Sequence, residues 1–424
     1  MALDFAQLFP DLPERLRTAA AAALADVAPH WERVEAIALR NQAKVLRAFQ
    51  EAGVAEHHFA PSSGYGLDDP GREKLEEVYA RVFRAEAALV RWQIASGTHA
   101  IALGLFAALR PGDELVAAVG TPYDSLHPVL RGAPGSLAEW GVAYREVPLR
   151  PDGRPDLEAL RAALSPRTRA VLIQRSRGYS LRPSLTVAEV GEVVAAVKSV
   201  RPDVLCLVDN CYGEFAEEQE PTEVGADLCM GSLIKNPGGG LAPTGGYVVG
   251  RRELVERAAA RLTAPGIAGE VGAAPWGHRL LFQGLFLAPH VVAEAICGAH
   301  FTAAFFERLG LRVRPRYDEP RTDLIQAVEL GSEEAMLAFC RAVQRASPVG
   351  AHLTPVPEQM AGYADPVIMA AGTFVQGSSI ELSADGPVRP PYAVYFQGGL
   401  TRQHVILAAL QAAAELHAQG MLPG

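Results

Sequence analysis

The sequence is poor in cysteine, with five in 424 residues, and no two of them form a C-x-x-C pair. A disulfide-stapled secreted domain or a zinc ribbon needs closely spaced or paired cysteines, so neither class is indicated. We expect reduced thiols, some of them simply buried. This pattern favours a cytoplasmic protein. The five are Cys206, Cys211, Cys229, Cys297 and Cys340.

Long hydrophobic runs and an excess of positive charge are also missing. Apolar stretches such as 19–25 are short and bounded by charge, so we expect no segment that spans a bilayer. Asp4 lies where a secretory signal would be basic, so no signal peptide is expected. The formal net charge of −9 disfavours nucleic acid and anionic membranes as partners. With 49% hydrophobic and 21% charged residues, the composition is that of a soluble globular protein.

The length predicts two or three domains. Residues 1–60 are rich in Ala, Glu and Arg with a helical periodicity, and proline marks breaks at Pro10, Pro13 and Pro29. We expect this segment to be an arm of helices without its own core.

Residues 61–288 alternate between helical patterns and short apolar runs. Runs that are nearly continuous in Val, Leu and Ile, separated by helices, predict an α/β domain whose mostly parallel sheet is covered on both faces. The predicted strands are 87–92, 114–119, 170–174, 205–208 and 246–249, and predicted helices include 98–109 and 185–200.

Residues 289–424 show a different pattern. A long helix over 291–309, a strand-like 312–314 and a closing helix from 403 predict a smaller α+β domain. We find no internal repeat along the chain.

Ligands of open α/β sheets bind beyond the carboxyl ends of the strands, so residues just after the apolar runs are the informative ones. "ASGTHA" follows the first run and opens a helix, and Ser96, Gly97 and Thr98 there suit a phosphate. A plain helix cap is the simpler interpretation of the same residues. Tyr123 follows the second run in "GTPYDSL", where a packed loop tyrosine is the alternative.

Asp209 directly follows a buried strand in "LVDNCYGEF". A carboxylate there must cap a helix or pair with a cation, because an unpaired buried charge is costly. Further along, "MGSLIKNPGGGLAPTGGYVVG" sets Lys235 before three consecutive glycines. This arrangement favours either a phosphate cradle or a lysine kept free for chemistry. A nucleotide P-loop is disfavoured, since its lysine follows the glycines and precedes Ser or Thr, and a surface lysine in a plain turn is the other alternative.

In this order, the helix start, the aromatic, the strand-end aspartate and the glycine-flanked lysine resemble fold type I pyridoxal-phosphate enzymes. "VDN", "SGTHA" and "YGLDDPGREKLE" resemble the Cys/Met-metabolism group of carbon–sulfur lyases. The stretch from Asp209 to Gly250 is most similar to the methionine gamma-lyase-like proteins called aluminium-resistance proteins. The resemblance runs from about Ala55 nearly to the C-terminus, through "GSSIELSADGPVRPPYAVYFQGGLT". The better-studied lyases have Ser-x-Thr-Lys at the lysine, whereas Ile234 precedes Lys235 here.

The resemblance implies pyridoxal 5'-phosphate as cofactor, with Lys235 forming its Schiff base and Asp209 holding the pyridine nitrogen protonated. Tyr123 would stack on the ring and supply a proton to a leaving thiolate. Tyr65 and Arg72 would reach the phosphate of an adjacent protomer, so a homodimer or homotetramer is implied. The phosphate contacts implied within the chain are Ser96, Gly97, Thr98 and Ser232.

The reaction implied is β- or γ-elimination from a sulfur amino acid, which gives a 2-oxo acid, ammonia and a thiol. The substrate carboxylate needs a cation, and the planar fork of arginine suits it. In the related lyases this arginine comes from the C-terminal domain, where Gln397 stands in the segment that matches most naturally. We favour Arg389, in "DGPVRPPY", over Arg177, in "QRSRGYSLRP".

Two alternatives stay open at this stage. An aminotransferase would use the same lysine and aspartate and differ only in its second half-reaction. A non-enzymatic metal-tolerance protein would need metal ligands, and no H-x-x-x-H or Cys/His spacing supports it. The remaining candidates for ligands are better interpreted as two loop histidines and a solvated acidic face: His57, His58, Glu214, Glu217, Glu218 and Glu220.

Overall fold

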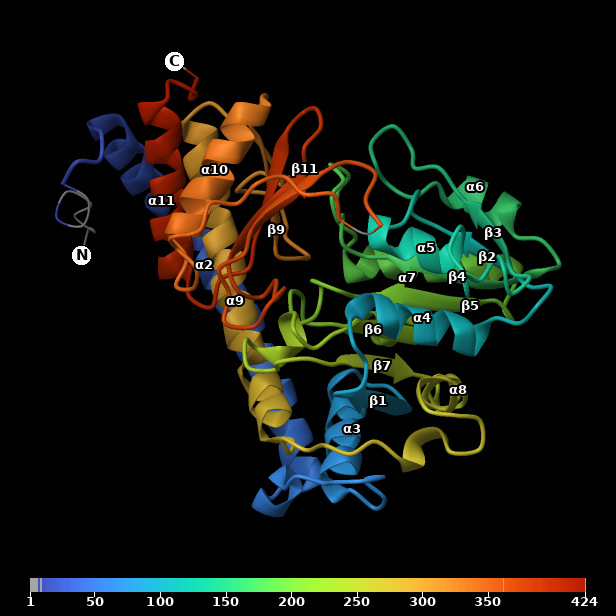
Figure 1. Ribbon diagram of the computed structural model, residues 1–424. Coiled ribbons are helices and arrows are strands. Elements are labelled where there is room, and N and C mark those ends of the chain that lie inside the picture. Colours follow the sequence, from blue (N-terminus) through green and yellow to red (C-terminus); the bar gives the residue numbers. More distant parts are fainter. Residues whose placement is uncertain (1–6, 8–9, 361, 424) are drawn as a thin grey trace. The chain divides into compact units, whose positions relative to one another are not determined.

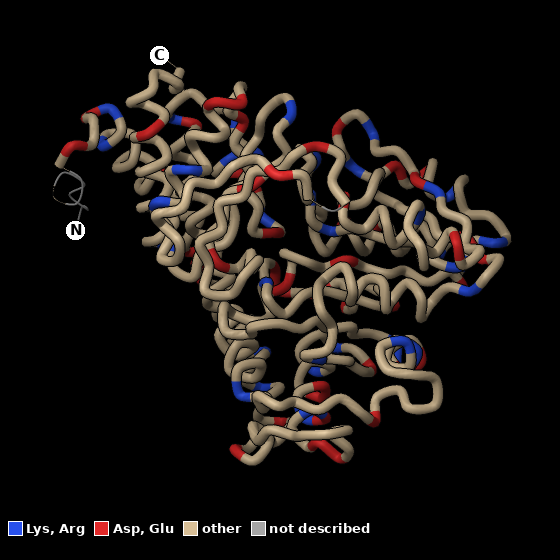
Figure 2. The backbone as a smooth tube through the Cα atoms, in the orientation of Figure 1, with Lys and Arg blue, Asp and Glu red and all other residues tan. Residues whose placement is uncertain are grey.

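The structure, a computed structural model, describes residues 7, 10–360 and 362–423. It divides into two compact units. The large unit comprises residues 40–177 and 182–289, and the small unit comprises residues 1–39, 178–181 and 290–424. Figure 2 shows basic and acidic positions interspersed along the backbone.

The large unit is built on a seven-stranded sheet with the order β1-β7-β6-β5-β4-β2-β3. Strands β3, β2, β4, β5 and β6 run parallel to one another, and β7 is antiparallel to both β6 and β1. The predicted mostly parallel sheet is therefore confirmed. The strands are β1 Ala87–Arg91, β2 Glu114–Ala117, β3 Ala143–Glu146, β4 Thr168–Gln174, β5 Leu205–Asp209, β6 Leu228–Ser232 and β7 Gly246–Gly250.

Helices cover this sheet, and its strands are buried along most of their length except for β3, whose residues are partly exposed. Helix α4 packs against β5, β6 and β7, and α8 packs against α4, β1 and β7 (Figure 1). Gly104 of α4 allows the closest approach, since a Cβ there would lie 2.1 Å from the sulfur of Met230. The α-helices within the large unit are α3 Pro70–Val82, α4 Gly97–Ala108, α5 His127–Leu130, α6 Leu157–Ala163, α7 Val187–Val200 and α8 Arg252–Leu262.

The small unit has a five-stranded antiparallel sheet with the order β10-β11-β12-β9-β8. Its strands are β8 Arg312–Arg314, β9 Ile325–Glu329, β10 Val367–Ala370, β11 Ser383–Pro387 and β12 Ala393–Gln397. Its helices are α10 Glu333–Arg345 and α11 Arg402–Ala418, with parts of α2 Glu14–Ala52 and α9 Arg279–Arg308.

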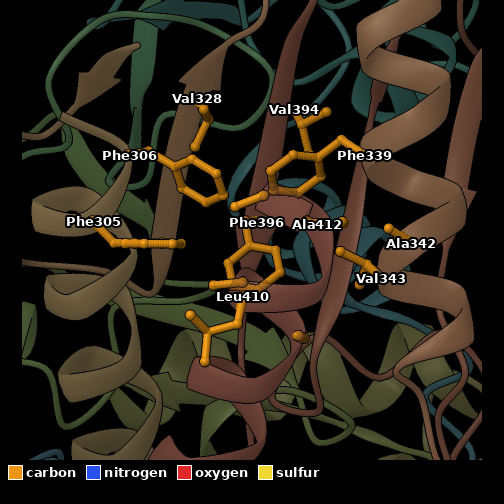
Figure 3. Packing of buried hydrophobic residues seen from close by; sticks show 14 of the residues in the cluster. Phe305, Phe306, Val328, Phe339, Ala342, Val343, Val394, Phe396, Leu410 and Ala412 are labelled. Atoms are coloured by element: carbon orange, nitrogen blue, oxygen red, sulfur yellow. The ribbon is translucent and has the colours of Figure 1, made fainter. Parts of the chain in front are cut away.

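Aromatic rings fill the core of the small unit. Phe339 of α10 has its ring centroid 5.4 Å from that of Phe306 on α9 and 5.9 Å from that of Phe396 on β12. Figure 3 shows these rings beside Val328, Val394 and Leu410. Tilted and edge-on pairs of this kind add to the free energy gained by burying apolar area.

The helix boundaries differ from expectation at two prolines. The predicted break at Pro29 is wrong, because α2 continues through it. The neighbouring turns are held by packing, with Val27 fully buried and the Trp31 indole donating to the carbonyl of Cys297 at 2.9 Å. Such anchoring outweighs the lost N–H and the ring clash of a helical proline. Helix α9 likewise continues through Pro289, so it begins 12 residues before the predicted start at 291 (291 − 279).

By length and composition, α9 is the one helix among the described residues that could cross a membrane, and 72% of its most apolar window is buried inside the protein. That burial is typical of the core helix of a globular fold.

Candidate functional site

Three segments at the carboxyl edge of the large sheet meet around Gly97. A Cβ on this glycine would lie 3.2 Å from the Cys211 sulfur, 3.4 Å from the Ser232 Cβ and 3.8 Å from the Lys235 Nζ. The start of α4, the loop after β5 and the end of β6 are therefore within contact distance of one another. Residues from "SGTHA", "DNCYGEF" and "GSLIK", far apart in sequence, form one site.

Lys235 differs from the other lysines in what surrounds its amine. Its Nζ lies 4.2 Å from the ring centroid of Tyr212, over the face of the ring. Burial by itself would lower the pKa of Lys235, but the ionisable groups of Cys211, Tyr212, Asp209 and Glu214 raise the pKa above its usual value. The chain has only four lysines, and each of the other three donates to an oxygen acceptor: Lys44 to Glu218, Lys74 to Glu77 and Lys198 to Asp227.

Asp209 is the last residue of β5 and is only 8% exposed. One carboxylate oxygen accepts the Cys211 N–H at 3.1 Å. Burial is the largest influence on Asp209 and raises its pKa, although Lys235, the hydrogen bonds of Cys211 and the charge of Arg182 act in the opposite direction. A further cation beside this buried carboxylate would favour its ionised form.

The phosphate candidates lie around the start of α4. Ser96 is the N-cap of α4, and its Oγ accepts the His99 N–H at 3.0 Å, so the simple capping interpretation is confirmed. The Thr98 hydroxyl hydrogen-bonds the Ser125 hydroxyl at 3.1 Å. Ser232 is buried at the end of β6. The capping side chain accepts only one of the free backbone N–H groups of the first turn, so the remaining N–H groups can still bind an anion.

The loop that carries Tyr123 is hydrogen-bonded to the end of β4. The backbone N–H of Tyr123 donates to Gln174 Oε1 at 2.6 Å, and the Gln174 amide in turn donates to the carbonyl of Ser176 at 2.8 Å. Gln174 ends β4, which neighbours β5 in the sheet. Tyr123 therefore belongs to the same edge of the large sheet as Asp209.

The two candidate arginines have different surroundings. Arg177 follows β4 and is buried, with its backbone N–H donating to Ser184 Oγ at 3.1 Å. Arg389 lies in the turn between β11 and β12 of the small unit, where its side chain is 44% exposed. Its guanidinium pairs with the Asp365 carboxylate at 2.9 Å. The guanidinium group of Arg389 is thus accessible, whereas that of Arg177 belongs to a buried residue.

Tyr65 and Arg72 also differ. Tyr65 is 76% exposed, whereas Arg72 is 3% exposed. The Arg72 guanidinium donates to the carbonyl of Gly66 at 2.5 Å and to that of Glu270 at 3.2 Å. Arg72 therefore supports the loop that presents Tyr65.

The prediction of a solvated acidic face is wrong. Glu214 and Glu220 are fully buried, and only Glu218 is well exposed, at 45% of its side chain. Hydrogen bonds compensate for the burial, since Glu220 accepts from the Asn210 amide at 2.9 Å and Glu214 accepts from the Tyr247 hydroxyl at 2.7 Å. His58 is buried as well, and its Nδ1 accepts the Ala55 N–H at 2.9 Å. In the described part of the chain no group of three or more His, Cys, Asp or Glu side chains could hold a metal ion.

Sequence reasoning missed Tyr212, Glu214 and Arg182 as members of the site. Tyr212 has a φ of 73°, a left-handed conformation that is unusual for a side chain of this size. A tyrosine gives no sequence signal for that conformation, as a glycine would. The position of Glu214 within "DNCYGEF", close to Asp209, was the one available hint.

Comparison with known proteins shows to which family the chain is related. A family model described as methionine gamma-lyase matches residues 16–417. An uncharacterized protein of Bacillus subtilis, YnbB, is 52% identical over 396 residues, which cover 92% of this chain and 94% of YnbB. An L-methionine gamma-lyase of Pseudomonas putida is 32% identical over 194 residues, which cover 45% of this chain and 43% of that enzyme.

Solved structures agree with the sequence relatives. A carbon–sulfur lyase involved in aluminium resistance from Clostridium novyi superposes with a TM-score of 0.93 at 44% identity, covering 97% of this chain and 98% of the other. The pyridoxal-5'-phosphate-dependent protein YhfS of Escherichia coli gives a TM-score of 0.61 at 19% identity, covering 89% and 96%, and shares the fold.

Proposed function

Because the chain belongs to the methionine gamma-lyase family, we propose that it is a pyridoxal-phosphate-dependent carbon–sulfur lyase acting on a sulfur amino acid. The observation that carries the proposal is the meeting of Cys211, Ser232 and Lys235 around Gly97 at the start of α4, with the Asp209 carboxylate accepting the Cys211 N–H. The carbon–sulfur lyase of Clostridium novyi, which matches almost the whole chain, supports the same activity.

The residues present fit the cofactor. Gly97 leaves free the space that a Cβ would take between Ser232 and Lys235, where an anion can approach the first turn of α4. Asp209 is a buried carboxylate able to pair with a protonated ring nitrogen. Lys235 has its amine over a ring face and is available for a covalent link.

When bound, the cofactor supplies an electron sink for the negative charge that develops at the substrate Cα. Asp209 would keep the ring nitrogen positive, so that the sink stays effective. Lys235 would hold the cofactor through its Nζ and would take the proton from the substrate Cα with the same atom. Tyr123 would lie against the ring and give a proton to the departing thiolate sulfur. Ser96, Gly97, Thr98 and Ser232 would hold the phosphate in place.

Borohydride reduction followed by peptide mapping tests the proposal directly. The purified protein should be yellow, and reduction should fix the cofactor on Lys235. With only four lysines the map is simple, and Lys44, Lys74 and Lys198 serve as internal controls. A colourless protein, or a label on one of those three, would overturn the assignment.

A substrate panel would then identify the reaction. Cysteine, cystathionine, homocysteine and methionine should be assayed for the 2-oxo acid, ammonia and the thiol product. Release of ammonia without an amino acceptor supports elimination. Dependence on a 2-oxo acid acceptor would instead indicate an aminotransferase.

We further propose a cytoplasmic homodimer or homotetramer with active sites at subunit interfaces. All five cysteines are free and buried, which suits a reducing compartment. Tyr65 and Leu67 are 76% and 60% exposed on the loop that Arg72 supports, an unusual exposure that suits contact with a second copy. Light scattering should give at least twice the mass of the 45.2 kDa chain, and a fully active monomer would contradict this prediction.

We propose Arg389 for the substrate carboxylate, supported by its accessible guanidinium, which donates to the Asp365 carboxylate and can donate to another carboxylate in the same way. Replacing Arg389 with Ala should lower kcat/KM about a hundredfold, because a lost charged contact costs a few kcal/mol in transition-state binding. The visible spectrum of the cofactor should not change. Arg177→Ala is the matched variant: unchanged kinetics in Arg389→Ala with a large loss in Arg177→Ala would give the role to Arg177.

A further inference from the structure

A cavity of about 420 Å³ on the large unit is lined mainly by basic side chains. It lies between the C-terminal part of α2, the turn that ends α3 and the loop after β5. Five of its nine lining residues are basic and only two are acidic, although the whole chain has a formal net charge of −9. None of the residues proposed to hold the cofactor or the substrate lines this cavity. The basic residues are Arg40, Lys44, Arg47, Arg81 and Arg84.

The walls of the cavity are fixed to one another by buried hydrogen bonds. Asn41 of α2 is fully buried, and its side-chain amide donates to the carbonyls of Phe215 at 3.1 Å and Glu217 at 2.9 Å. These bonds hold the loop after β5 against α2. At the far end of the loop, the Thr222 hydroxyl donates to the carbonyl of Phe83 at the end of α3. The cavity is therefore formed before a ligand arrives, which lowers the entropy cost of binding.

Two cations on α2 have no acidic partner. Lys44 donates to the backbone carbonyl of Glu218 at 2.9 Å and pairs with no carboxylate among the described residues. Arg47 is exposed and forms no ion pair within the part of the chain that the structure describes. With Arg40 these two follow the spacing i, i+4 and i+7, which places three like charges on one face of the helix. Like charges at this spacing destabilise a helix, and a bound anion would remove the repulsion.

Arg84 lies at a position that favours glycine. It follows α3 with a φ of 47°, and the next N–H, of Ala85, donates to the Ala80 carbonyl at 2.8 Å, as in a helix end closed by a left-handed residue. A long side chain is strained in this conformation. The Arg84 side chain is 69% exposed, whereas its carboxylate partner Glu223, at 3.2 Å, is 6% exposed. The guanidinium thus extends outward and can donate to an anion as well as to Glu223.

The two ion pairs within the cavity are open to exchange. Arg40 pairs with Glu218, and Arg81 pairs with Glu51 at 3.1 Å. All four side chains are at least 40% exposed. Exposed ion pairs contribute little free energy, because water screens them and two long side chains must be ordered. A ligand with several negative charges can therefore take the place of these carboxylates.

We propose that this cavity binds a compact polyanion, a small molecule with two or more phosphate groups. Four of its five cations are arginines, whose planar guanidinium groups donate paired hydrogen bonds to phosphate. The apolar lining consists of Ala43 and Ala48, which offer no ring for a base to stack on, so the phosphate groups provide the recognition. The net charge of the chain repels nucleic acid. This inference does not depend on the proposed function.

Isothermal titration calorimetry of the purified full chain with inorganic triphosphate, in a buffer free of phosphate, tests the site. We expect one triphosphate per chain, with an affinity that falls as salt is added, because salt screens exposed charges. Arg47→Ala should weaken binding about tenfold, a typical loss for one charged hydrogen-bond partner. Arg84→Gly should weaken binding similarly while Tm stays near that of the wild type, because glycine suits the backbone conformation there.

The Glu218→Gln variant should have the opposite effect. It removes the carboxylate that competes for Arg40, so triphosphate should bind several-fold more tightly. Arg150→Ala is the matched control and should leave the affinity unchanged, since Arg150 is an exposed arginine of the large unit that pairs with Asp152 at 2.8 Å, outside the cavity.

Three results would overturn the inference and leave the proposed function standing. The first is a wild type that does not bind triphosphate. The second is a wild-type affinity in both Arg47→Ala and Arg84→Gly, or an equally large loss in Arg150→Ala, which would indicate a general attraction to surface arginines. The third is binding of a polyglutamate peptide without binding of triphosphate, which would assign the surface to an acidic protein.

Discussion

Replacement of Lys235 by Ala is expected to abolish turnover, with kcat at least about a thousandfold below that of the wild type. The variant loses both the covalent attachment and the base that moves the Cα proton, and general acid–base catalysis alone contributes about 10²–10⁴-fold. The fold should survive, because the Lys235 amine contacts the face of Tyr212 and forms no ion pair with any other residue that the structure describes.

The measurements are kcat, borohydride labelling and the visible spectrum. The variant should retain loosely bound cofactor that reduction no longer fixes to the chain. Lys44→Ala is the matched control, since Lys44 donates only to the backbone carbonyl of Glu218. Activity within tenfold of the wild type in Lys235→Ala would rule out this lysine as the attachment point.

Replacement of Asp209 by Asn is expected to lower kcat by roughly a hundred- to a thousandfold. Asparagine keeps the shape and can still accept the Cys211 N–H, which the aspartate accepts at 3.1 Å. It carries no charge, so the ring nitrogen would no longer be held protonated and the electron sink would weaken. Cofactor affinity should fall less than kcat, because the phosphate and covalent contacts remain.

Steady-state kinetics and equilibrium dialysis of the cofactor separate these two effects. Asp203→Asn is the control, since Asp203 is an exposed carboxylate paired with Arg201 at 2.8 Å. A variant at Asp209 that lost cofactor but kept a normal kcat when saturated would indicate a purely structural role for the carboxylate.

Much of the large unit followed from local patterns in the sequence. The side chains of a short, continuously apolar strand can all be buried only when both faces of the strand are covered. Five such runs between helical stretches predicted β1, β2, β4, β5 and β7. Strands β3 and β6 were not among the predicted strands. The residues of β3 are partly exposed and its sequence, "AYRE", contains no apolar run, whereas β6, "LCMGS", is short and ends in Gly and Ser. The order of the polar residues at the strand ends indicated the family, and the family comparison confirms it.

The sequence by itself determined which segments carry the chemistry, because a glycine-flanked lysine and a strand-end aspartate leave a local signature. Only the tertiary structure decided which charges are buried and what balances them. The sequence from Glu214 to Glu220 predicts a solvated acidic face. In the structure, two of its carboxylates are fully buried around Arg175, Asn210 and Tyr247. Burial and charge pairing depend on partners distant in sequence, from β4, β6 and β7, and no local pattern encodes them.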